Sequence, residues 1–154
     1  MDHLPRPTKY TLVSGASEGA TGLNAFDGAL LRAGIGNVNL VKVSSILPPG
    51  AAYAGSLAIP PGSLVPVAYA AITSETPGDV IAAAVGIGRS RDTFGIIMEF
   101  SGHCTREEAE EKVRLMIEDA CKKRGMIPAD VDVVGVQHKV ERAGCAFAAV
   151  PMWY

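Results

Sequence analysis

The stretch of this sequence that most limits its fold reads NVNLVKVSSILPPG and spans residues 37–50. It begins with a valine-rich apolar run, which favours a β-strand. It ends in Pro-Pro-Gly, which cannot continue a strand because proline lacks the backbone donor that a sheet requires. Ser44 and Ser45 lie between the two parts, so the sequence places a serine pair where a strand ends. Serines at such a place most often bond nearby backbone groups.

A serine held rigidly in this position can also cut the chain. If Oγ of Ser45 attacks the carbonyl carbon of Ser44, the amide becomes an ester. Loss of the Ser45 α-proton then expels the Ser44 carboxylate by β-elimination. The dehydroalanine left at position 45 tautomerises and hydrolyses to a pyruvoyl group, with release of ammonia. The protein would then carry a ketone cofactor of its own making, although a serine pair alone supports this reaction only weakly.

The surrounding residues are more specific. NLVKVSSILPPG, preceded by GASEGATGLNAFDGALLRAGIGN and followed by GIIMEFSG, resembles the pyruvoyl-dependent arginine decarboxylases over nearly the whole chain. The resemblance implies self-cleavage into residues 1–44, the β chain, and residues 45–154, the α chain. It implies a pyruvoyl cofactor derived from Ser45, with no pyridoxal phosphate and no metal, and conversion of L-arginine to agmatine through a Schiff base. It also implies a trimer whose active sites lie between protomers.

The resemblance further implies roles for single residues. Asn39 matches a family asparagine and is expected to polarise the Ser44 carbonyl, as an oxyanion-hole donor does; taken alone, it is a turn former at a strand end. Glu99 is expected to protonate the substrate Cα after carbon dioxide departs. Asp27 is expected to hold the substrate guanidinium. Less strongly supported positions that would shape the pocket are Leu23, Gly36, Val38 and Ile97.

Asp27 has two interpretations. Apolar residues at helical spacing predict a helix that Asn24 caps and Gly34 ends. Asp27 then lies in the first turn, where a carboxylate interacts favourably with the helix dipole. The resemblance favours the other interpretation, because a carboxylate can accept two N–H groups from the planar guanidinium of arginine. In that case Asp27 determines specificity for arginine.

Glu99 also has two interpretations. It is the one carboxylate in the apolar run FGIIMEF, which is predicted to be a strand over residues 94–100. Spacing slightly favours a side chain that points to solvent on the alternate face. The other possibility is a buried carboxyl whose pKa rises, so that it holds its proton and can act as a general acid near neutral pH.

Other periodic segments predict the remaining elements. Further strands are expected at residues 10–13, 64–74, 80–86, 131–140 and 143–150. The last two are expected to form a terminal hairpin around Glu141 and Arg142. A capping box at Thr105 predicts a second helix that ends at Gly125.

The segments between these elements predict loops. Residues 1–8 are expected to form an irregular arm, and the glycine-rich residues 15–22 a tight loop that shapes a pocket. Residues 46–62 are expected to form a long loop able to cover a site. Many strands with two helices predict an α+β fold, a layered α/β/β/α sandwich in a single domain of residues 1–154.

Composition excludes several classes of function. With 48% hydrophobic and 19% charged residues the chain is expected to fold compactly, and a net charge of −2 gives no basic surface for nucleic acid. Three cysteines at wide spacing indicate neither a disulfide framework nor a zinc site. His103 and Cys104 lack a second ligand pair, so no metal is expected. Without a signal peptide or an apolar run long enough for a bilayer, a soluble cytoplasmic protein is expected.

Two other functions fit the same residues. One is the same pyruvoyl chemistry on another amino acid, such as histidine, against which Asp27 argues because it suits a long cationic side chain. The other is a non-catalytic oligomeric binding module, in which Ser44 and Ser45 merely end a strand and the chain is never cleaved.

Overall fold

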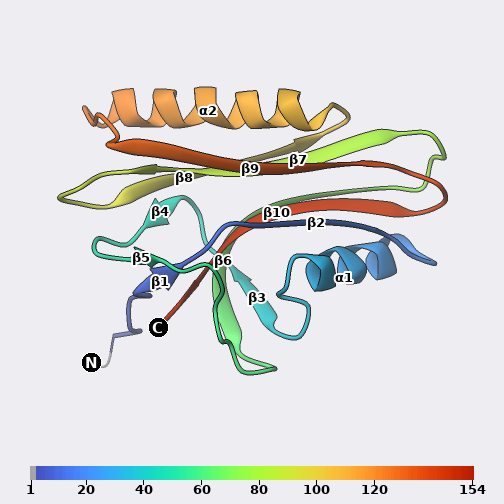
Figure 1. Ribbon diagram of the computed structural model, residues 1–154, viewed down its shortest axis with the longest axis horizontal. Coiled ribbons are helices and arrows are strands. Elements are labelled where there is room, and N and C mark those ends of the chain that lie inside the picture. The colour runs from blue at the N-terminus through green and yellow to red at the C-terminus, as the bar shows by residue number, and fades with distance from the viewer. Residues whose placement is uncertain (1–2) are drawn as a thin grey trace.

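The computed structural model describes residues 3–154 and has four layers, namely a helix, two sheets and a second helix. Helix α1 (Gly22–Arg32) covers the outer face of one sheet, and helix α2 (Arg106–Lys123) covers the outer face of the other (Figure 1). The predicted α/β/β/α sandwich is therefore confirmed. Neither helix within these residues has the length and apolar character needed to cross a membrane.

The first sheet is built around a central strand. Its strands run in the order β3-β6-β10-β1-β5, with β2 also paired to β10. They are β1 (Lys9–Tyr10), β2 (Val13–Glu18), β3 (Asn39–Lys42), β5 (Ala52–Tyr53), β6 (Leu64–Ser74) and β10 (Gly144–Trp153). Strand β10 pairs antiparallel with β2 on one side and β6 on the other, and it is buried from Gly144 to Met152. Its continuous small apolar sequence suits a strand that is covered on both faces.

The second sheet is antiparallel throughout. Its strands run in the order β4-β8-β7-β9, with bounds β4 (Ile46–Leu47), β7 (Val80–Arg89), β8 (Gly95–Gly102) and β9 (Asp130–Lys139). The alanine-rich segment of β7 is a strand, as predicted, and it is buried on both faces. Ala83 and Val85 face the other sheet, whereas Ala82 and Ala84 face α2. Alternating side chains of this one strand thus contribute to two of the three apolar cores, the one between the sheets and the one under α2.

Helix α2 follows its sequence signals. The Thr105 hydroxyl accepts a hydrogen bond from the Glu108 backbone N–H at 3.2 Å, which is the predicted N-cap. Gly125 adopts a φ of +63° just beyond the helix, where residues other than glycine are strained. Both predicted ends of this helix are confirmed.

The predicted terminal hairpin is wrong. Strand β9 pairs with β7 in the second sheet, and β10 pairs with β2, β6 and β1 in the first. The turn at residues 140–143 therefore carries the chain from one sheet to the other. Periodicity identified both strands but not their partners, because strand pairing depends on contacts distant in sequence.

One carboxylate fixes this turn. Glu18, at the end of β2, accepts hydrogen bonds from the backbone N–H groups of Glu141, Arg142 and Ala143 at 2.9–3.1 Å, and it is bonded to His138 Nε2 at 2.6 Å. The hydrogen bonds from the Glu141 backbone and from His138 hold the pKa of Glu18 well below its usual value, at about 2.

The predicted loop at residues 15–22 is wrong in its first half, because Gly15 to Glu18 belong to β2. A Cβ on Gly15 would lie 2.4 Å from the Ala29 carbonyl oxygen, so the glycine permits close contact between β2 and α1 rather than a turn. Likewise, the predicted strand at residues 10–13 is divided between β1 and β2, and the loop at 46–62 contains the short strands β4 and β5. Within the predicted arm, residues 3–8 are irregular, and residues 1–2 lie outside the described part of the chain.

Candidate active site

The serine pair lies where the chain passes from the first sheet to the second. Before the pair, β3 runs parallel to β6, and the Val43 N–H donates to the Val67 carbonyl at 3.0 Å. After it, the Ser45 carbonyl accepts from the Ile97 N–H at 2.7 Å, and β4 pairs with β8. The Ser44–Ser45 peptide therefore connects two anchored segments that belong to different sheets, and we call this connection the crossover. Ser44 is exposed and Ser45 is half-buried.

Glu99 lies two residues beyond Ile97 on β8, and alternation puts both side chains on the face toward the first sheet. Ile97 is fully buried between the sheets, and the Ser101 hydroxyl donates to the Ala71 carbonyl of β6 at 3.2 Å. Glu99, between these two residues, is half-buried. Burial raises its pKa above the usual value, and the positive charge of Lys42 opposes that rise. The second interpretation of Glu99, a carboxyl inclined to keep its proton, fits this geometry.

Asp27 lies on the exposed face of α1. The helix begins three residues earlier than predicted, because Thr21 rather than Asn24 is the N-cap, and the Thr21 hydroxyl accepts from the Asn24 N–H at 3.2 Å. The first turn therefore contains no acidic residue, and the predicted helix-dipole role of Asp27 is wrong. No hydrogen bond or ion pair engages the Asp27 carboxylate within residues 3–154. The group is free to bind a cation.

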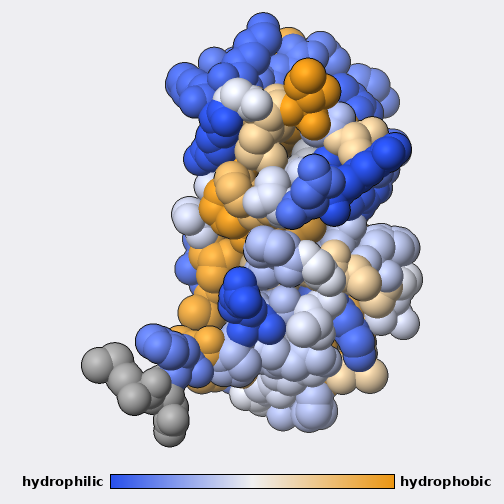
Figure 2. Space-filling model, turned by 90° about the vertical axis from the view of Figure 1, so that its left-hand side faces the viewer, coloured by the Kyte–Doolittle hydropathy of each residue, from blue (hydrophilic) through white to orange (hydrophobic). Residues whose placement is uncertain are grey.

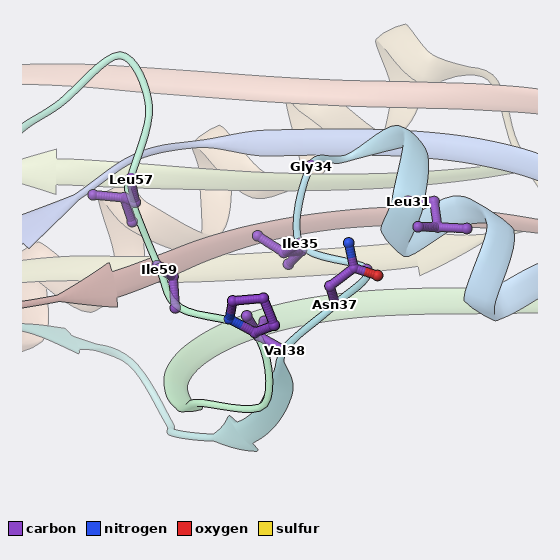
Figure 3. Close-up of a pocket in the computed structure, with 9 residues that line it drawn as sticks. Leu31, Gly34, Ile35, Asn37, Val38, Leu57 and Ile59 are labelled. Carbon is purple, nitrogen blue, oxygen red and sulfur yellow. The ribbon is translucent and has the colours of Figure 1, made fainter.

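A small cavity of about 200 Å³ opens at the end of α1 (Figure 3). Leu31, at the C-terminal turn of the helix, lines it with Gly36 and Val38 of the following segment, and Leu57 and Ile59 line it from the loop before β6. Leu23, Asp27 and Leu31 are spaced by four residues, so they form one line along the helix that leads to this cavity.

Asn39 lies at the opposite end of β3 from the serine pair. Its side-chain amide donates to the Gly62 carbonyl at 3.0 Å, and its backbone N–H donates to the Ser63 carbonyl at 2.8 Å. Asn39 and Ser44 are five positions apart along a nearly extended chain, a span of roughly 16 Å. Such a span is too long for the Asn39 side chain to contact the Ser44 carbonyl of the same chain.

The predicted residues thus fall into two groups. We define the serine half-site as Ser44, Ser45, Ile97 and Glu99, which the crossover and β8 bring together. We define the carboxylate half-site as Leu23, Asp27, Gly36, Val38 and Asn39, on α1 and the segment that follows it. No hydrogen bond or ion pair joins the two half-sites within the described residues. Residues 3–154 also hold no cluster of acidic, histidine or cysteine side chains that could bind a metal.

Sequence reasoning missed Lys42, whose charge acts on Glu99. The signal that was available is its position, because it is the one charged residue in the apolar run before the serine pair.

Comparison with known proteins gives consistent results. Residues 9–153 match the model of a family described as pyruvoyl-dependent arginine decarboxylase. A curated protein of that name from Methanocaldococcus jannaschii is 48% identical over 150 residues, which cover 96% of this chain and 91% of the relative. Another from Pyrococcus abyssi is 46% identical over 151 residues, which cover 96% of each chain. A third, from Thermococcus sibiricus, is 45% identical with 95% of each chain covered.

Proposed function

Because the chain belongs to the pyruvoyl-dependent arginine decarboxylase family, we propose that it cuts itself between Ser44 and Ser45 and then converts L-arginine to agmatine and carbon dioxide. The observation that carries the proposal is the position of the serine pair, held between two sheets, with the Ser45 carbonyl bonded to Ile97 two residues before the half-buried Glu99 on β8. The agmatine would serve polyamine synthesis or acid resistance.

The anchoring of the crossover supports self-cleavage at this bond. In the first step a bond forms from Ser45 Oγ to the Ser44 carbonyl carbon while that carbon's bond to nitrogen breaks. The Ser45 α-proton then leaves, the Cβ–Oγ bond breaks, and Ser44 departs as a carboxylate; water later replaces the nitrogen, which leaves as ammonia. Because both flanking segments stay bonded to their sheets, the reacting atoms are held near one another throughout.

The residues at the crossover also fit a pyruvoyl group. When formed, this group supplies a ketone that acts as an electron sink for the negative charge left at the substrate Cα. The Ile97 N–H, bonded to the residue-45 carbonyl at 2.7 Å, fixes the orientation of that carbonyl. Such a backbone donor also stabilises negative charge that develops on a carbonyl oxygen.

Glu99 is the proposed proton donor. Its burial raises its pKa and so favours the neutral carboxyl, which is the form that can give a proton to the substrate Cα once carbon dioxide has left. An ordinary exposed glutamate would already be ionised at neutral pH and could not perform this step.

Asp27 is proposed to bind the substrate guanidinium, and its exposure indicates that another surface must cover it. An ion pair formed in open solvent contributes only about 0–1 kcal/mol, which gives little selectivity. We therefore propose that the serine half-site of one protomer and the carboxylate half-site of another form each active site, in a trimer of processed protomers. Covering Asp27 in this way would strengthen its pairing with arginine.

Two further features support this assembly. Strand β3 covers the edge of β6 only from Leu64 to Val67, and β4 covers the edge of β8 only at two residues, so both sheets have unpaired edges beyond the crossover. Large apolar side chains near these segments are 40–77% exposed, namely Leu23, Val41, Ile46 and Leu64. Figure 2 shows that apolar surface forms a band down one side of the face it presents. Unpaired edges and exposed apolar groups are typical of surfaces that a partner covers.

Mixing two defective variants tests the shared site. Asp27→Ala impairs the carboxylate half-site and Glu99→Gln impairs the serine half-site, and both are assayed at an arginine concentration too low for Asp27→Ala to turn over. If sites lie between copies, randomly mixed trimers of the two variants regain about a quarter of wild-type activity, because some sites combine two intact halves. Sites contained within one chain would regain none, and that result would contradict the proposed assembly.

Substrate choice is tested by carbon dioxide release from L-arginine and L-histidine. Arginine should be preferred, and Asp27→Ala should raise the KM for arginine while the rate of self-cleavage is unchanged. A comparable loss of cleavage in this variant would contradict the proposed role of Asp27. Preference for histidine would support the alternative substrate, and an uncut, inactive chain would support the binding module.

We also propose a cytoplasmic location. Cys104, Cys121 and Cys145 are free thiols, which suits a reducing compartment. Fractionation of cells that express the protein tests this assignment, and recovery outside the cytoplasm would contradict it.

A further inference from the structure

A second cavity lies beside the cavity at the end of α1. It has a volume of about 140 Å³, and three of its lining residues, Gly34, Ile35 and Leu57, also line the first cavity (Figure 3). Its other walls come from the start of β2, the last turn of α1, the loop before β6 and the end of β10. Thr11 is among the lining residues, so we call this space the Thr11 cavity. Neither half-site contributes a residue to it.

The Thr11 side chain is directed into this cavity. Thr11 lies between β1 and β2, and the register of both strands with β10 is continuous from Tyr10 to Val13. The Thr11 N–H donates to the Pro151 carbonyl at 3.2 Å, which keeps Thr11 in that register. Alternation therefore puts its side chain on the face of Val13, which packs toward α1, whereas Tyr10 lies between the sheets.

The Thr11 hydroxyl has no partner in the described part of the chain. Thr11 is 4% exposed, yet its side chain forms no hydrogen bond with residues 3–154. Within these residues no fully enclosed side-chain oxygen or nitrogen lacks a partner, so the hydroxyl opens onto the cavity that Thr11 lines. Burial of an unpaired hydroxyl is unfavourable, and a molecule in the cavity that bonds to it removes that cost.

The rest of the side-chain lining is apolar. Val13, Ile35 and Leu57 supply hydrocarbon walls. Ser56 also lines the cavity but is exposed, so Thr11 is the buried polar side chain there. No charged side chain from residues 3–154 lines the cavity. A charged ligand would therefore lose its water without gaining a counterion.

The end of α1 adds hydrogen-bond acceptors to this lining. The Gly34 N–H donates to the Leu31 carbonyl at 3.1 Å, and the Ile35 N–H donates to the Leu30 carbonyl at 3.0 Å, so neither donor is available to a ligand. The carbonyl groups of Ala33 and Gly34 accept no backbone hydrogen bond within the described residues, as is usual for the last carbonyls of a helix. A ligand at this end must therefore donate.

We propose that the Thr11 cavity is a binding site for a small neutral alcohol. The ligand hydroxyl donates to a carbonyl at the end of α1 and accepts from the Thr11 hydroxyl, while its hydrocarbon part fills the apolar walls. A volume of 140 Å³ is that of about five water molecules in the liquid, so the ligand has about four to six non-hydrogen atoms. This inference does not depend on the proposed decarboxylation.

Water fits this lining less well than an alcohol does. A buried water typically makes about three hydrogen bonds, and the cavity offers such partners at Thr11 and the helix end but not along its apolar walls. Water beside those walls is poorly held, and its displacement by an apolar group favours binding.

The test uses tert-butanol, a neutral alcohol of this size, with the purified wild-type protein. Its addition is followed by NMR of the methyl groups of Ile35 and Leu57, which line the cavity. We expect saturable shifts of these methyl signals, and a crystal grown with the alcohol should place its oxygen within hydrogen-bond distance of the Thr11 hydroxyl. Absence of saturable shifts, or density at this place that fits only water, would overturn the inference.

Matched controls test the two features that define the site. Thr11→Ser keeps the hydroxyl and should bind the alcohol nearly as tightly as wild type. Thr11→Val keeps the shape without the hydroxyl and should bind it several-fold more weakly. The wild-type protein should also bind tert-butylammonium, which has the same shape but a charge, several-fold more weakly, and this comparison requires no variant to fold. Equal affinity in either comparison would overturn the inference.

Discussion

Close contact between α1 and β2 makes one stability prediction especially sharp. A Cβ added to Gly28, in the middle of α1, would lie 2.4 Å from Oγ and 2.9 Å from Cβ of Ser17 on β2. The hydroxyl can rotate away, but the Ser17 Cβ cannot, so the helix must shift. Asp27 precedes Gly28, and its carboxylate would move with the helix. Gly22, in the first turn of the same helix, has no atom closer than 3.8 Å to its added Cβ.

The opposing energies can be estimated. Overpacking of this kind costs about 1–3 kcal/mol. Replacing a helical glycine by alanine recovers about 0.5–1 kcal/mol. We therefore expect Gly28→Ala to lose up to about 2.5 kcal/mol net, which for a chain of this size lowers Tm by up to about 10 °C. Gly22→Ala, where nothing is crowded, should leave Tm unchanged or raise it slightly.

Both variants are melted in the uncleaved Ser45→Ala background, so that a single chain unfolds. The processed forms are assayed as well, where Gly28→Ala should raise the KM for arginine and Gly22→Ala should not. If Gly28→Ala melts at or above the temperature of Gly22→Ala, then Gly28 of α1 does not lie close enough to Ser17 of β2 for an added Cβ to collide with it.

Three other predictions concern the charges of two carboxylates and the association of the two fragments after cleavage. Glu99→Gln in the Ser45→Ala background should raise Tm at neutral pH but not near pH 4. The reason is that folding raises the pKa of Glu99, so the folded protein loses stability as pH rises above the unfolded pKa of 4.5. Equal shifts in Tm at both pH values would contradict this. Glu18→Gln should lower Tm above pH 4.5, and this deficit should disappear as pH falls toward about 2, since the pKa of Glu18 is depressed; melting curves that show the same deficit at every pH would argue against the ionised Glu18 as the group that holds the turn at residues 140–143. After cleavage, residues 1–44 should remain bound in native mass spectra, because β2 pairs with β10 at six positions and Leu30 and Ile35 are buried; loss of the short fragment in native buffer would refute this.

Local patterns predicted much of the fold. The apolar runs identified β6, β7, β8 and the last two strands, and the capping box identified α2. What the patterns lacked was strand pairing, since β9 and β10 look like a hairpin in sequence and lie in different sheets. The glycine-rich sequence also led to a wrong loop prediction at residues 15–22, because Gly15 permits close packing of β2 against α1 and does not form a turn. Such packing depends on the partner surface, which is distant in sequence.

The candidate site was predictable in part. The serine pair and Glu99 could be found because these residues are unusual in their apolar surroundings, and the structure bonds Ser45 to β8, the strand that contains Glu99. The helix start was misplaced because Thr21 and Asn24 are both good capping residues, and this misplaced Asp27 within the helix. The separation of the two half-sites could not be read from sequence, because it depends on the position of α1 relative to β8.

Self-cleavage at Ser45 is best tested by the intact mass of the purified protein under denaturing conditions. A processed protein gives two masses, for residues 1–44 and 45–154, with the longer fragment lighter than a serine-started chain by one ammonia. Borohydride should add two hydrogens to that fragment, as expected for a ketone. A single chain of 154 residues that persists after prolonged warm incubation would rule out self-cleavage and with it the pyruvoyl cofactor.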